Sequence, residues 1–470
     1  MLTFDLSLIK RKEKIMALKS INPTTGALIK SYKEEGSKSI DTKIEKAHRA
    51  WKTWRRTAIP VKCTHLNDLA ILLEDYKKDF AELICNEMGK PCLEAVAEIE
   101  KCAWVSRYYA ENGKFMLKEE EIKTGAEKSY VSFEALGVVL GVMPWNFPFW
   151  QAFRFAVPAL LAGNAVLLKH ARNVSGSALA IEKVIREAGF PEDVFQTLLI
   201  SSARVRQVIE HEHVAAVSLT GSEEAGSKVA QTAGKMLKKS VLELGGSDPF
   251  IVLKEANLRE AAKTAVKARM INSGQSCIAA KRLIVEAPVY DSFMKILVEE
   301  FEKLVCGDPN DEATDVGPLA REDILKKLSD QVRLSVKKGA KVLIGGSRKK
   351  RKGNFYLPTL MVNVYPGMPV FDEEVFGPVL PVIKAIDADD AIYLANLSNF
   401  GLGASLWTEN PDQIPRLVKL LQSGTVTVNG MVRSDPRMPF GGIKKSGYGR
   451  ELAHYGLKEF VNIKSIIINR

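Results

Sequence analysis

The stretch AAVSLTGSEEAGSKVAQTAGKMLKKSVLELGG, residues 215–246, decides the fold class of this chain. It begins with a short apolar run and continues as a helical pattern with small and apolar residues three or four positions apart. It ends in a second apolar run, KSVLELGG. A strand, a helix and a strand of these lengths predict parallel strands joined by a right-handed crossover.

The same alternation continues on both sides of this stretch. NAVLLKH at 164–170 reads as a strand and SGSALAIEKVIREAG at 175–189 as a helix. After Pro249 the pattern resumes with strands FIVLK and RLIVE, a helix from Asn257, and helices at 290–304 and 321–338. A second α/β domain is therefore expected to begin near Gly245.

The segment before the first strand is helical. Apolar residues recur at three and four positions in three runs between residues 39 and 116, and Gly89 and Gly113 are expected to close the last two helices. Residues 136–168 are long and apolar, but prolines and polar residues interrupt them. A buried strand, a loop and a core helix are expected there rather than a membrane span.

Composition and charge exclude several classes of protein. The 470 residues are 46% hydrophobic and 26% charged, which is typical of a soluble α/β chain with more than one core. The net charge of +11 includes a run at 348–352, which we interpret as a solvated hairpin loop rather than a nuclear-import or polyanion patch. The six cysteines follow no disulfide or metal-ligand spacing, so a reducing, cytoplasmic setting is expected.

Cys277 is a candidate nucleophile. It lies in NSGQSCIAAKR, residues 272–282, after a helix and in a turn where backbone amides can lower the pKa of a thiol. A thiolate that adds to an aldehyde forms an adduct that expels hydride, and the remaining thioester is readily hydrolysed. Ordinary packing is the alternative for a single cysteine.

Two other residues can complete such a site. Glu243 in LELGG ends a strand between two leucines, where partial burial would raise the pKa of its carboxyl toward that of a general base. The two glycines that follow are expected to let backbone approach closely. Asn146 in PWNFP is fixed between prolines, and its amide can donate to an oxyanion together with the Cys277 amide. A surface ion pair for Glu243 and a plain turn for Asn146 are the alternatives.

SLTGSEEAG, residues 218–226, lies between a strand and a helix. A helix N-terminus with bare amides favours a phosphate group, although the segment is not the GxGxxG fingerprint. The residues that would take part are Thr220, Gly221, Ser222 and Gly226.

The order of the motifs is more specific than any one of them. PWNFP, LLKH, TGS, LELGG, GQSC, EEVFGP and PFGGIKKSGYGRE follow one another, with Glu243 34 residues before Cys277. In this order they resemble the aldehyde dehydrogenase family, from INPTTG at 21 to the C-terminus. The resemblance implies an α/β fold with a Rossmann-type cofactor domain, an α/β catalytic domain and a small β oligomerisation element.

The resemblance also implies a division of the chain. The expected parts are an NAD(P)-binding domain at 17–117 and 137–244, a catalytic domain at 245–445, and an oligomerisation element at 118–136 and 455–470. Residues 1–16 are expected to be a disordered extension, with Met16 a candidate start. A homodimer or homotetramer is implied, and no metal is required.

The roles that the resemblance carries over are a nucleophile at Cys277, a general base at Glu243 and an oxyanion donor at Asn146. Contacts to the cofactor, NADP or NAD, fall on Met143, Pro144, Trp145, Lys169, Thr220, Gly221, Ser222, Gly226, Leu244, Glu374 and Phe376. Where many NAD-preferring members have Glu, three residues after the lysine, this chain has Arg172, which can accept a 2′-phosphate.

Arg154 bears on the substrate. It matches an arginine with which succinate-semialdehyde dehydrogenases bind the substrate's carboxylate, whereas a second arginine of that branch is Ile271 here. Candidate substitutes for the second arginine are Arg269, Arg433, Ser434 and Arg437.

The leading hypothesis is NAD(P)-dependent oxidation of succinate semialdehyde to succinate through a Cys277 thioester. A broader aldehyde dehydrogenase acting on glutarate semialdehyde or apolar aldehydes is the close alternative. A CoA-acylating relative and a catalytically silent protein on this fold are more distant alternatives. The expected partner is a small aldehyde, with no nucleic acid and no membrane.

Overall fold

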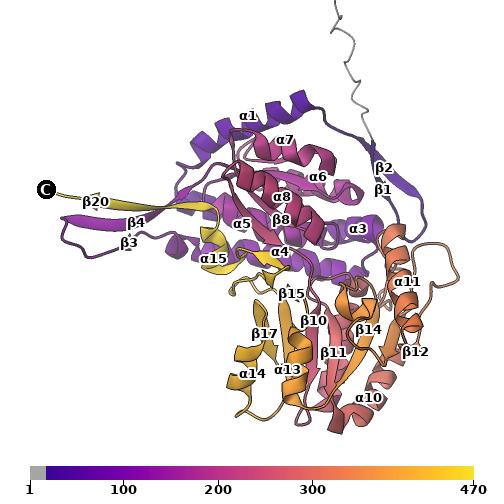
Figure 1. Ribbon diagram of the computed structural model, residues 1–470. Coiled ribbons are helices and arrows are strands. Elements are labelled where there is room, and N and C mark those ends of the chain that lie inside the picture. Colours follow the sequence, from indigo (N-terminus) through magenta and orange to yellow (C-terminus); the bar gives the residue numbers. More distant parts are fainter. Residues whose placement is uncertain (1–16) are drawn as a thin grey trace, which may run out of the picture.

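The computed structural model describes residues 17–470 (Figure 1). The extension predicted at residues 1–16 lies outside this range. Two large sheets form separate lobes, one above the other in Figure 1, and a thin β arm projects to the left. The α/β class expected from the alternation of strands and helices is confirmed.

The upper lobe contains a six-stranded sheet. Its strands are β5 (Val138–Met143), β6 (Ala165–His170), β7 (Phe195–Thr197), β8 (Val214–Thr220), β9 (Lys239–Glu243) and β19 (Gly447–Tyr448). They lie in the order β19-β9-β8-β5-β6-β7, and all neighbours are parallel except β19 and β9. The connections run in opposite directions from the central pair β5 and β8, so the carboxyl ends of these two strands border a ligand-binding crevice.

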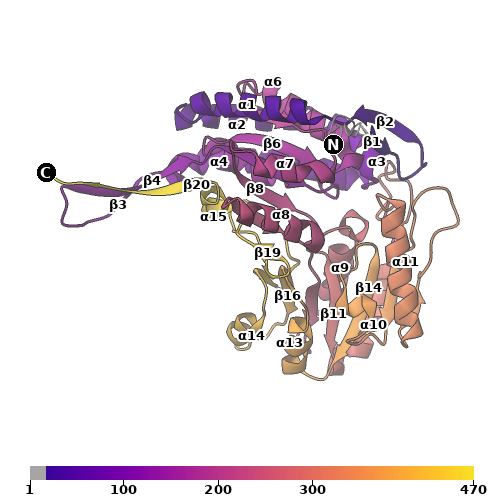
Figure 2. The same ribbon diagram turned by 45° about the horizontal axis from the view of Figure 1, so that its top comes forward.

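Helices join and cover these strands. The connecting helices are α5 (Pro148–Leu161), α6 (Ser175–Glu187), α7 (Val205–Glu210) and α8 (Glu223–Lys235). The preceding helices are α1 (Ser37–Trp54), α2 (Ile59–Asp75), α3 (Lys77–Met88) and α4 (Cys92–Met116). Figure 2 shows α1 and α2 stacked along the outer side of the lobe. The continuous core of α2, α4 and α5 fixes α5 beneath the crevice.

Two expectations for the N-terminal helices need correction. The single helix expected around residues 65–89 is divided at Tyr76 into α2 and α3, with Gly89 ending α3 in a left-handed conformation at φ 78°. Gly113 does not end α4, because the helix continues to Met116. A Cβ at Gly113 would overlap the side chain of Leu161, so this glycine permits close packing of α4 on α5.

The lower lobe contains a seven-stranded sheet. Its strands are β10 (Asp248–Val252), β11 (Ala280–Glu286), β12 (Lys341–Ile344), β13 (Thr359–Val362), β14 (Val379–Ala385), β16 (Gly403–Trp407) and β17 (Thr425–Val428). Their order is β12-β13-β14-β11-β10-β16-β17, with only β12 antiparallel to its neighbour. The helices of this lobe are α9 (Leu258–Met270), α10 (Tyr290–Glu302), α11 (Glu322–Lys337), α12 (Pro369–Asp372), α13 (Ala388–Asn396) and α14 (Ile414–Leu420).

The basic run at 348–352 lies in the connection between antiparallel β12 and β13, beside a bridge between Arg348 and Tyr356. Arg348 forms an ion pair with Glu322 at 3.1 Å. The solvated hairpin loop expected for this run is therefore confirmed.

The arm is a three-stranded antiparallel sheet. It consists of β3 (Glu120–Glu121), β4 (Lys128–Ala135) and the C-terminal β20 (Val461–Ile468), in the order β20-β4-β3. The C-terminal strand β20 is matched with β4 residue by residue, from Val461 opposite Ala135 to Ile468 opposite Lys128. One edge of β20 has no partner strand among residues 17–470.

Smaller elements complete the described chain: the pairs β1 (Ala17–Ile21) with β2 (Leu28–Lys33) and β15 (Phe400–Gly401) with β18 (Ile443–Lys444), and the helix α15 (Ala453–Lys458). Across residues 17–470, every helix is too short or too polar to cross a membrane. The same range holds no group of three or more His, Cys, Asp or Glu placed to hold a metal ion.

Candidate active site

The candidate residues meet where the two lobes join. Glu243 is the last residue of β9, Asn146 follows the carboxyl end of β5, and Cys277 stands three residues before β11. The carboxyl edge of the upper sheet thus faces the amino edge of the lower one. Residues that are far apart in sequence are brought to one junction by the topology of the two sheets.

The backbone before Cys277 is unusual. Three consecutive residues, Asn272, Ser273 and Gly274, have φ of 53°, 55° and 75°. The side chains of the first two are buried and bonded: Asn272 donates to the carbonyls of Asn146 and Gln275, and Ser273 accepts from the amide of Gly317 at 2.9 Å. Left-handed backbone of this kind is retained where surrounding contacts enforce it, commonly at functional sites.

Burial raises the pKa of the Cys277 thiol to about 12, an effect that nearby Lys281 and Arg154 oppose. The lowered thiol pKa expected from the turn is therefore wrong for this structure. Desolvation of the thiolate outweighs the opposing effect of the two cations. Cys277 consequently needs a neighbouring base to take its proton, and the Glu243 carboxylate is close enough to act on its pKa.

Lys281 supports the nucleophile's backbone. Its buried Nζ donates to the carbonyls of Ser276 at 2.7 Å and Cys277 at 2.5 Å, and lies 3.4 Å from Glu374 Oε1. One ammonium group therefore joins the Cys277 turn to the segment carrying Glu374. Burial lowers the pKa of Lys281, against the opposing effect of Glu374.

Glu243 is 2% exposed, and neither of its carboxylate oxygens has a hydrogen-bond partner. Burial raises the pKa of this carboxyl, and the neighbouring Arg154 opposes the rise. A Cβ at Gly441 would lie 2.9 Å from Glu243 Oε1, so the PFGG segment leaves room for the carboxylate. An orphaned buried carboxylate of this kind is suited to act as a general base.

Arg154 lies beside Glu243, and its own partner is Glu451. The guanidinium Nε forms a buried ion pair with Glu451 Oε2, and one amino nitrogen donates to Thr220 Oγ1 at 3.3 Å. The Phe440 ring centre lies 4.7 Å from the guanidinium carbon. Arg154 is thus held by two segments, β8 and the C-terminal PFGGIKKSGYGRE stretch, and is only 1% exposed.

Asn146 is anchored to the nucleophile's loop. Its Nδ2 donates to the carbonyl of Gln275 at 3.1 Å, and its backbone carbonyl accepts from Asn272 Nδ2 at 2.6 Å. A side-chain amide has two N–H groups, so one remains after the bond to Gln275. Asn146 therefore keeps an N–H that can donate, on a side chain anchored to Gln275, two residues before Cys277.

The two glycines after Glu243 bring other groups close. The amide of Gly246 donates to Glu374 Oε1 at 3.0 Å, and a Cβ at that position would lie 2.5 Å from the Cys277 carbonyl oxygen. At Gly245 a Cβ would lie 2.7 Å from Glu374 Oε2. The close backbone approach expected from LELGG is confirmed.

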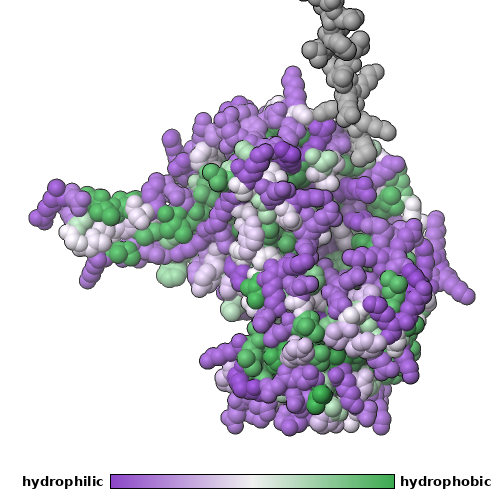
Figure 3. Space-filling model, viewed as in Figure 1, coloured by the Kyte–Doolittle hydropathy of each residue, from purple (hydrophilic) through white to green (hydrophobic). Residues whose placement is uncertain are grey.

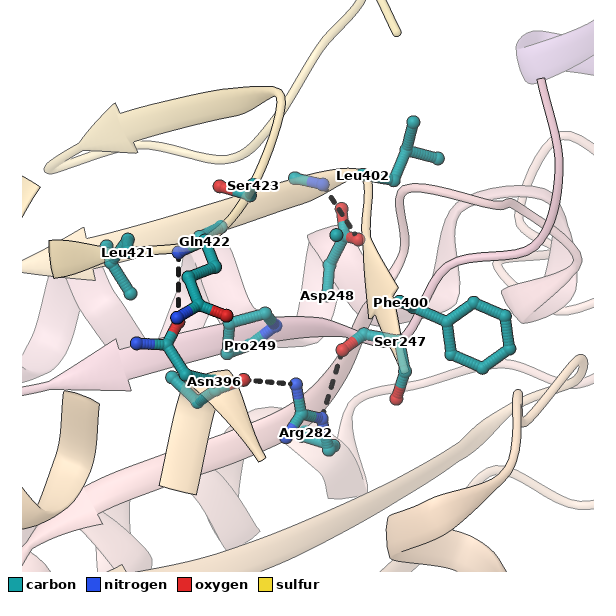
Figure 4. Close-up of a pocket in the computed structure, with 14 residues that line it drawn as sticks. Ser247, Asp248, Pro249, Arg282, Asn396, Phe400, Leu402, Leu421, Gln422 and Ser423 are labelled. Atoms are coloured by element: carbon teal, nitrogen blue, oxygen red, sulfur yellow. Dashed lines mark hydrogen bonds between the residues drawn. The ribbon is translucent and has the colours of Figure 1, made fainter. Parts of the chain in front are cut away.

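The chain that follows this turn, residues 247–249, lines a small hollow in the lower lobe (Figure 4). Polar groups there bind its backbone and side chains. Asp248 Oδ1 accepts from the amide of Gly403 at 3.0 Å, and Arg282 Nε donates to the carbonyl of Ser247 at 3.0 Å. Arg282 also donates to the carbonyls of Leu394 and Ala395 at 2.8 Å. These bonds fix the start of β10, the strand that follows the turn after Glu243.

Three of the residues expected to contact the cofactor, Met143, Lys169 and Thr220, lie at the carboxyl ends of strands in the upper sheet. Met143 ends β5 and is followed by Pro144 and Trp145, whose ring meets Phe376 edge to face at 5.7 Å. Ser222 caps α8 by accepting from the Ala225 amide. A Cβ at Gly226 would lie 2.5 Å from Leu244, so the helix start packs closely on the strand end.

Two cations stand together at the end of β6. Burial and the neighbouring Arg172 lower the pKa of Lys169 to about 8. Arg172 is exposed, and neither cation forms an ion pair among the described residues. Two cations without an ion-pair partner at the carboxyl end of β6 fit a nucleotide cofactor with an additional phosphate.

The four residues proposed to replace a second substrate-binding arginine differ in their burial and in their partners. Arg269 is sealed in the lower lobe, where it donates to the carbonyls of Val379 at 2.7 Å and Val375 at 2.9 Å, so a substrate role is wrong for it. Arg437 is exposed and paired with Asp435, and Arg433 is exposed as well. Only Ser434 is buried beside Arg154's helix, where it accepts from Lys101 Nζ.

Sequence reasoning missed Lys281, Glu451 and Lys101. The motifs contained a partial signal for Lys281 and Glu451, because Lys281 belongs to NSGQSCIAAKR and Glu451 to PFGGIKKSGYGRE. Lys101 carried no signal, since a lysine in an amphipathic helix usually faces solvent.

Comparison with known proteins agrees with this geometry. The Aldehyde dehydrogenase family matches residues 9–466. Succinate-semialdehyde dehydrogenase [NADP(+)] 1 of Mycobacterium tuberculosis is 46% identical, with 96% of this chain and 100% of the relative covered. The crystal structure of succinic semialdehyde dehydrogenase from Streptococcus pyogenes with NADP+ is 35% identical, with a TM-score of 0.94 and coverage of 97% of this chain and 100% of that one. The NAD+ complex of an aldehyde dehydrogenase from Bacillus cereus is 30% identical, with a TM-score of 0.93 and coverage of 97% and 93%.

The raised pKa of Glu243 predicts an acid limb in the pH profile of aldehyde turnover. A carboxyl with a raised pKa holds its proton to higher pH, so kcat should fall as the pH drops through a value well above 4.5. Glu243→Gln should lower kcat by about 10²- to 10⁴-fold and remove this limb. Glu299→Gln, an exposed change on α10, serves as the control. An unchanged acid limb in Glu243→Gln would show that another group is the base.

Proposed function

The chain belongs to the aldehyde dehydrogenase family, and from this premise we propose that it oxidises succinate semialdehyde to succinate, with NADP as the preferred hydride acceptor. The observation that carries the proposal is the junction of Cys277, Glu243 and Asn146 beside the buried cation Arg154. An uncharged aldehyde would not require cations at this position, whereas the carboxylate of a short acidic aldehyde would.

The chain's own residues account for the chemistry. Cys277 adds to the aldehyde carbon after its proton passes to Glu243, and the remaining N–H of Asn146 and the Cys277 amide stabilise the oxyanion. A bound nicotinamide would supply the acceptor for the hydride that leaves this carbon, and Glu243 releases the thiol proton to solvent before hydrolysis. Water then attacks the Cys277 thioester while Glu243 accepts one of its protons, and Glu243 passes this proton to the leaving thiolate, which releases the acid and the free thiol.

The same proposal assigns the cofactor contacts. Lys169 and Arg172 would hold the ribose and its 2′-phosphate, the start of α8 at Gly221 and Ser222 would hold the pyrophosphate, and Glu374 with Phe376 would hold the nicotinamide ribose. We also retain the division into the cofactor domain at 17–117 and 137–244, the catalytic domain at 245–445 and the arm; the three largest of the five sheets support it. The six free cysteines are in keeping with a cytoplasmic location.

Initial rates of the wild type test the substrate. With NADP, kcat/KM for succinate semialdehyde should exceed that for uncharged butanal by about 100-fold or more, because a buried cation favours the acid and gains nothing from the apolar aldehyde. Glutarate semialdehyde, one methylene longer, measures the length of the site. Equal kcat/KM for succinate semialdehyde and butanal would instead support the broader aldehyde dehydrogenase.

Reversing the charge at Arg172 tests the cofactor. Arg172→Glu should lower kcat/KM for NADP by about 10- to 100-fold, since it replaces a charge-assisted contact with repulsion of the 2′-phosphate. The value for NAD, which lacks that phosphate, should hold or rise. Arg186→Glu makes the same change at an exposed position on α6. Parallel losses for NADP and NAD in Arg172→Glu would refute the assignment.

The arm supports a homodimer or homotetramer. Green apolar patches run along it in Figure 3, and Ile463 and Ile467 are 59% and 63% exposed. Lysines at both positions should shift the mass measured by light scattering toward the monomer, because they would bury charge at a subunit contact. Asn462→Lys, on the opposite face of β20, is the control. An unchanged mass for the double variant would place the contact elsewhere.

A further inference from the structure

Lys101 lies in a cluster that the chemistry above leaves without a role. It belongs to α4; its Nζ donates to Ser434 Oγ at 2.7 Å and stands 4.2 Å from the centre of the Trp150 ring. Ser434 and Trp150 are 5% and 4% exposed, whereas Lys101 is half-buried. Trp150 and Arg154 are one turn apart on α5, so they share a face of that helix. The ammonium group therefore lies on the side of α5 that carries Arg154.

No carboxylate forms an ion pair with Lys101 within residues 17–470, although Asp435 and Glu98 favour its charged form. The two acidic groups near it have other partners. Asp435 accepts from Arg437 Nε at 2.9 Å and from an Arg437 amino nitrogen at 2.7 Å. Glu98 forms a buried ion pair with Lys90 and accepts from two backbone amides of α5. A half-buried ammonium group whose only hydrogen-bond partner is a hydroxyl is costly unless an anion joins it.

Arg154 alone does not supply a free positive charge for the carboxylate of the substrate. Its charge is balanced by the buried carboxylate of Glu451, which holds its Nε. Arg154 is nevertheless close enough to shift the pKa of both Cys277 and Lys101. Cys277 and Lys101 thus both interact electrostatically with the same guanidinium group, that of Arg154.

We propose that Lys101 and Ser434 form the second part of the substrate-carboxylate site, beside Arg154. Lys101 supplies a positive charge that no ion pair balances, whereas the charge of Arg154 is balanced by Glu451. The inference rests on the proposed function and deepens it by naming the residue that determines specificity. An ammonium group has three donors, and Ser434, which accepts from Lys101, keeps its own O–H to donate. The pair can therefore bind both oxygens of a carboxylate.

The ionisation of Lys101 gives the proposal a pH signature. Burial and Arg154 lower the pKa of Lys101 to about 8, while Cys102, Asp435 and Glu98 oppose the shift. Below this pH the free enzyme carries the charge that the acidic substrate requires. Above it the site loses the charge, and the preference for an acidic aldehyde should decline.

The test compares two substrates in matched variants. Lys101→Met keeps the length of the side chain and removes its charge; Lys114→Met does the same at an exposed position on the same helix. For Lys101→Met the ratio of kcat/KM for succinate semialdehyde to that for butanal should fall by about 10- to 100-fold, mainly through KM for the acid. Lys114→Met should keep the wild-type ratio.

Lys101→Arg supplies the second measurement. It should retain most of the ratio at pH 7 and keep it constant from pH 7 to 9.5, whereas the wild-type ratio should decline above about pH 8. The ionisations of Cys277 and Glu243 affect both substrates and cancel in the ratio. A merely structural lysine would alter neither the ratio nor its pH dependence.

The outcomes separate the two hypotheses. A wild type that does not prefer succinate semialdehyde over butanal overturns the proposed function. A wild type that does prefer it, together with an unchanged ratio in Lys101→Met, overturns only the role of Lys101. Equal losses for both aldehydes in Lys101→Met would also contradict it, because they would indicate a disturbed fold.

Discussion

The buried ion pair between Arg154 and Glu451 is the interaction on which the active site depends. Removing two charges from water is costly, and the cost is offset only when the remaining donors and acceptors are bonded. Here Thr220 accepts from Arg154, Ser218 lies 3.4 Å from Glu451 Oε1, and the Phe440 ring covers the guanidinium. The pair joins α5 to the C-terminal PFGGIKKSGYGRE segment and thereby closes the space in which Glu243 lies. Without Arg154, Glu243 and Glu451 would be two buried carboxylates with no cation between them.

Around this pair the protein retains ionisable groups that lack full partners. Neither carboxylate oxygen of Glu243 accepts a hydrogen bond, and the pKa values of Lys101 and Lys169 are lowered to about 8. Stability alone would disfavour such groups, so their occurrence together is typical of a functional site. Each is suited to a different part of the reaction: a base for the thiol and the water, a cation for the substrate, and a cation for the nucleotide.

The sequence allowed the fold class and the reacting residues to be predicted, because strand and helix periods are local and the motifs are short. The parallel strands around TGS and the close approach at LELGG followed from residues that lie next to one another. Features set by contacts between distant segments could not be read in this way. The break at Tyr76, the helical position of Gly113 beneath Leu161, and the Arg154–Glu451 pair depend on packing across the fold. The same holds for Cys277, whose expected low thiol pKa neglected burial, and for Arg269, whose guanidinium serves the backbone of the lower lobe.

A crystal structure of Cys277→Ala with NADP and succinate semialdehyde would test the central claim most directly, because it locates both ends of the substrate in the intact site. The account predicts that the aldehyde carbon lies over residue 277 and faces the amide of Asn146. The carboxylate should lie within hydrogen-bond distance of Lys101 and Ser434, with the Arg154–Glu451 pair intact. A carboxylate directed to solvent, or bound by Arg154 after separation from Glu451 while Lys101 makes no contact, would contradict it.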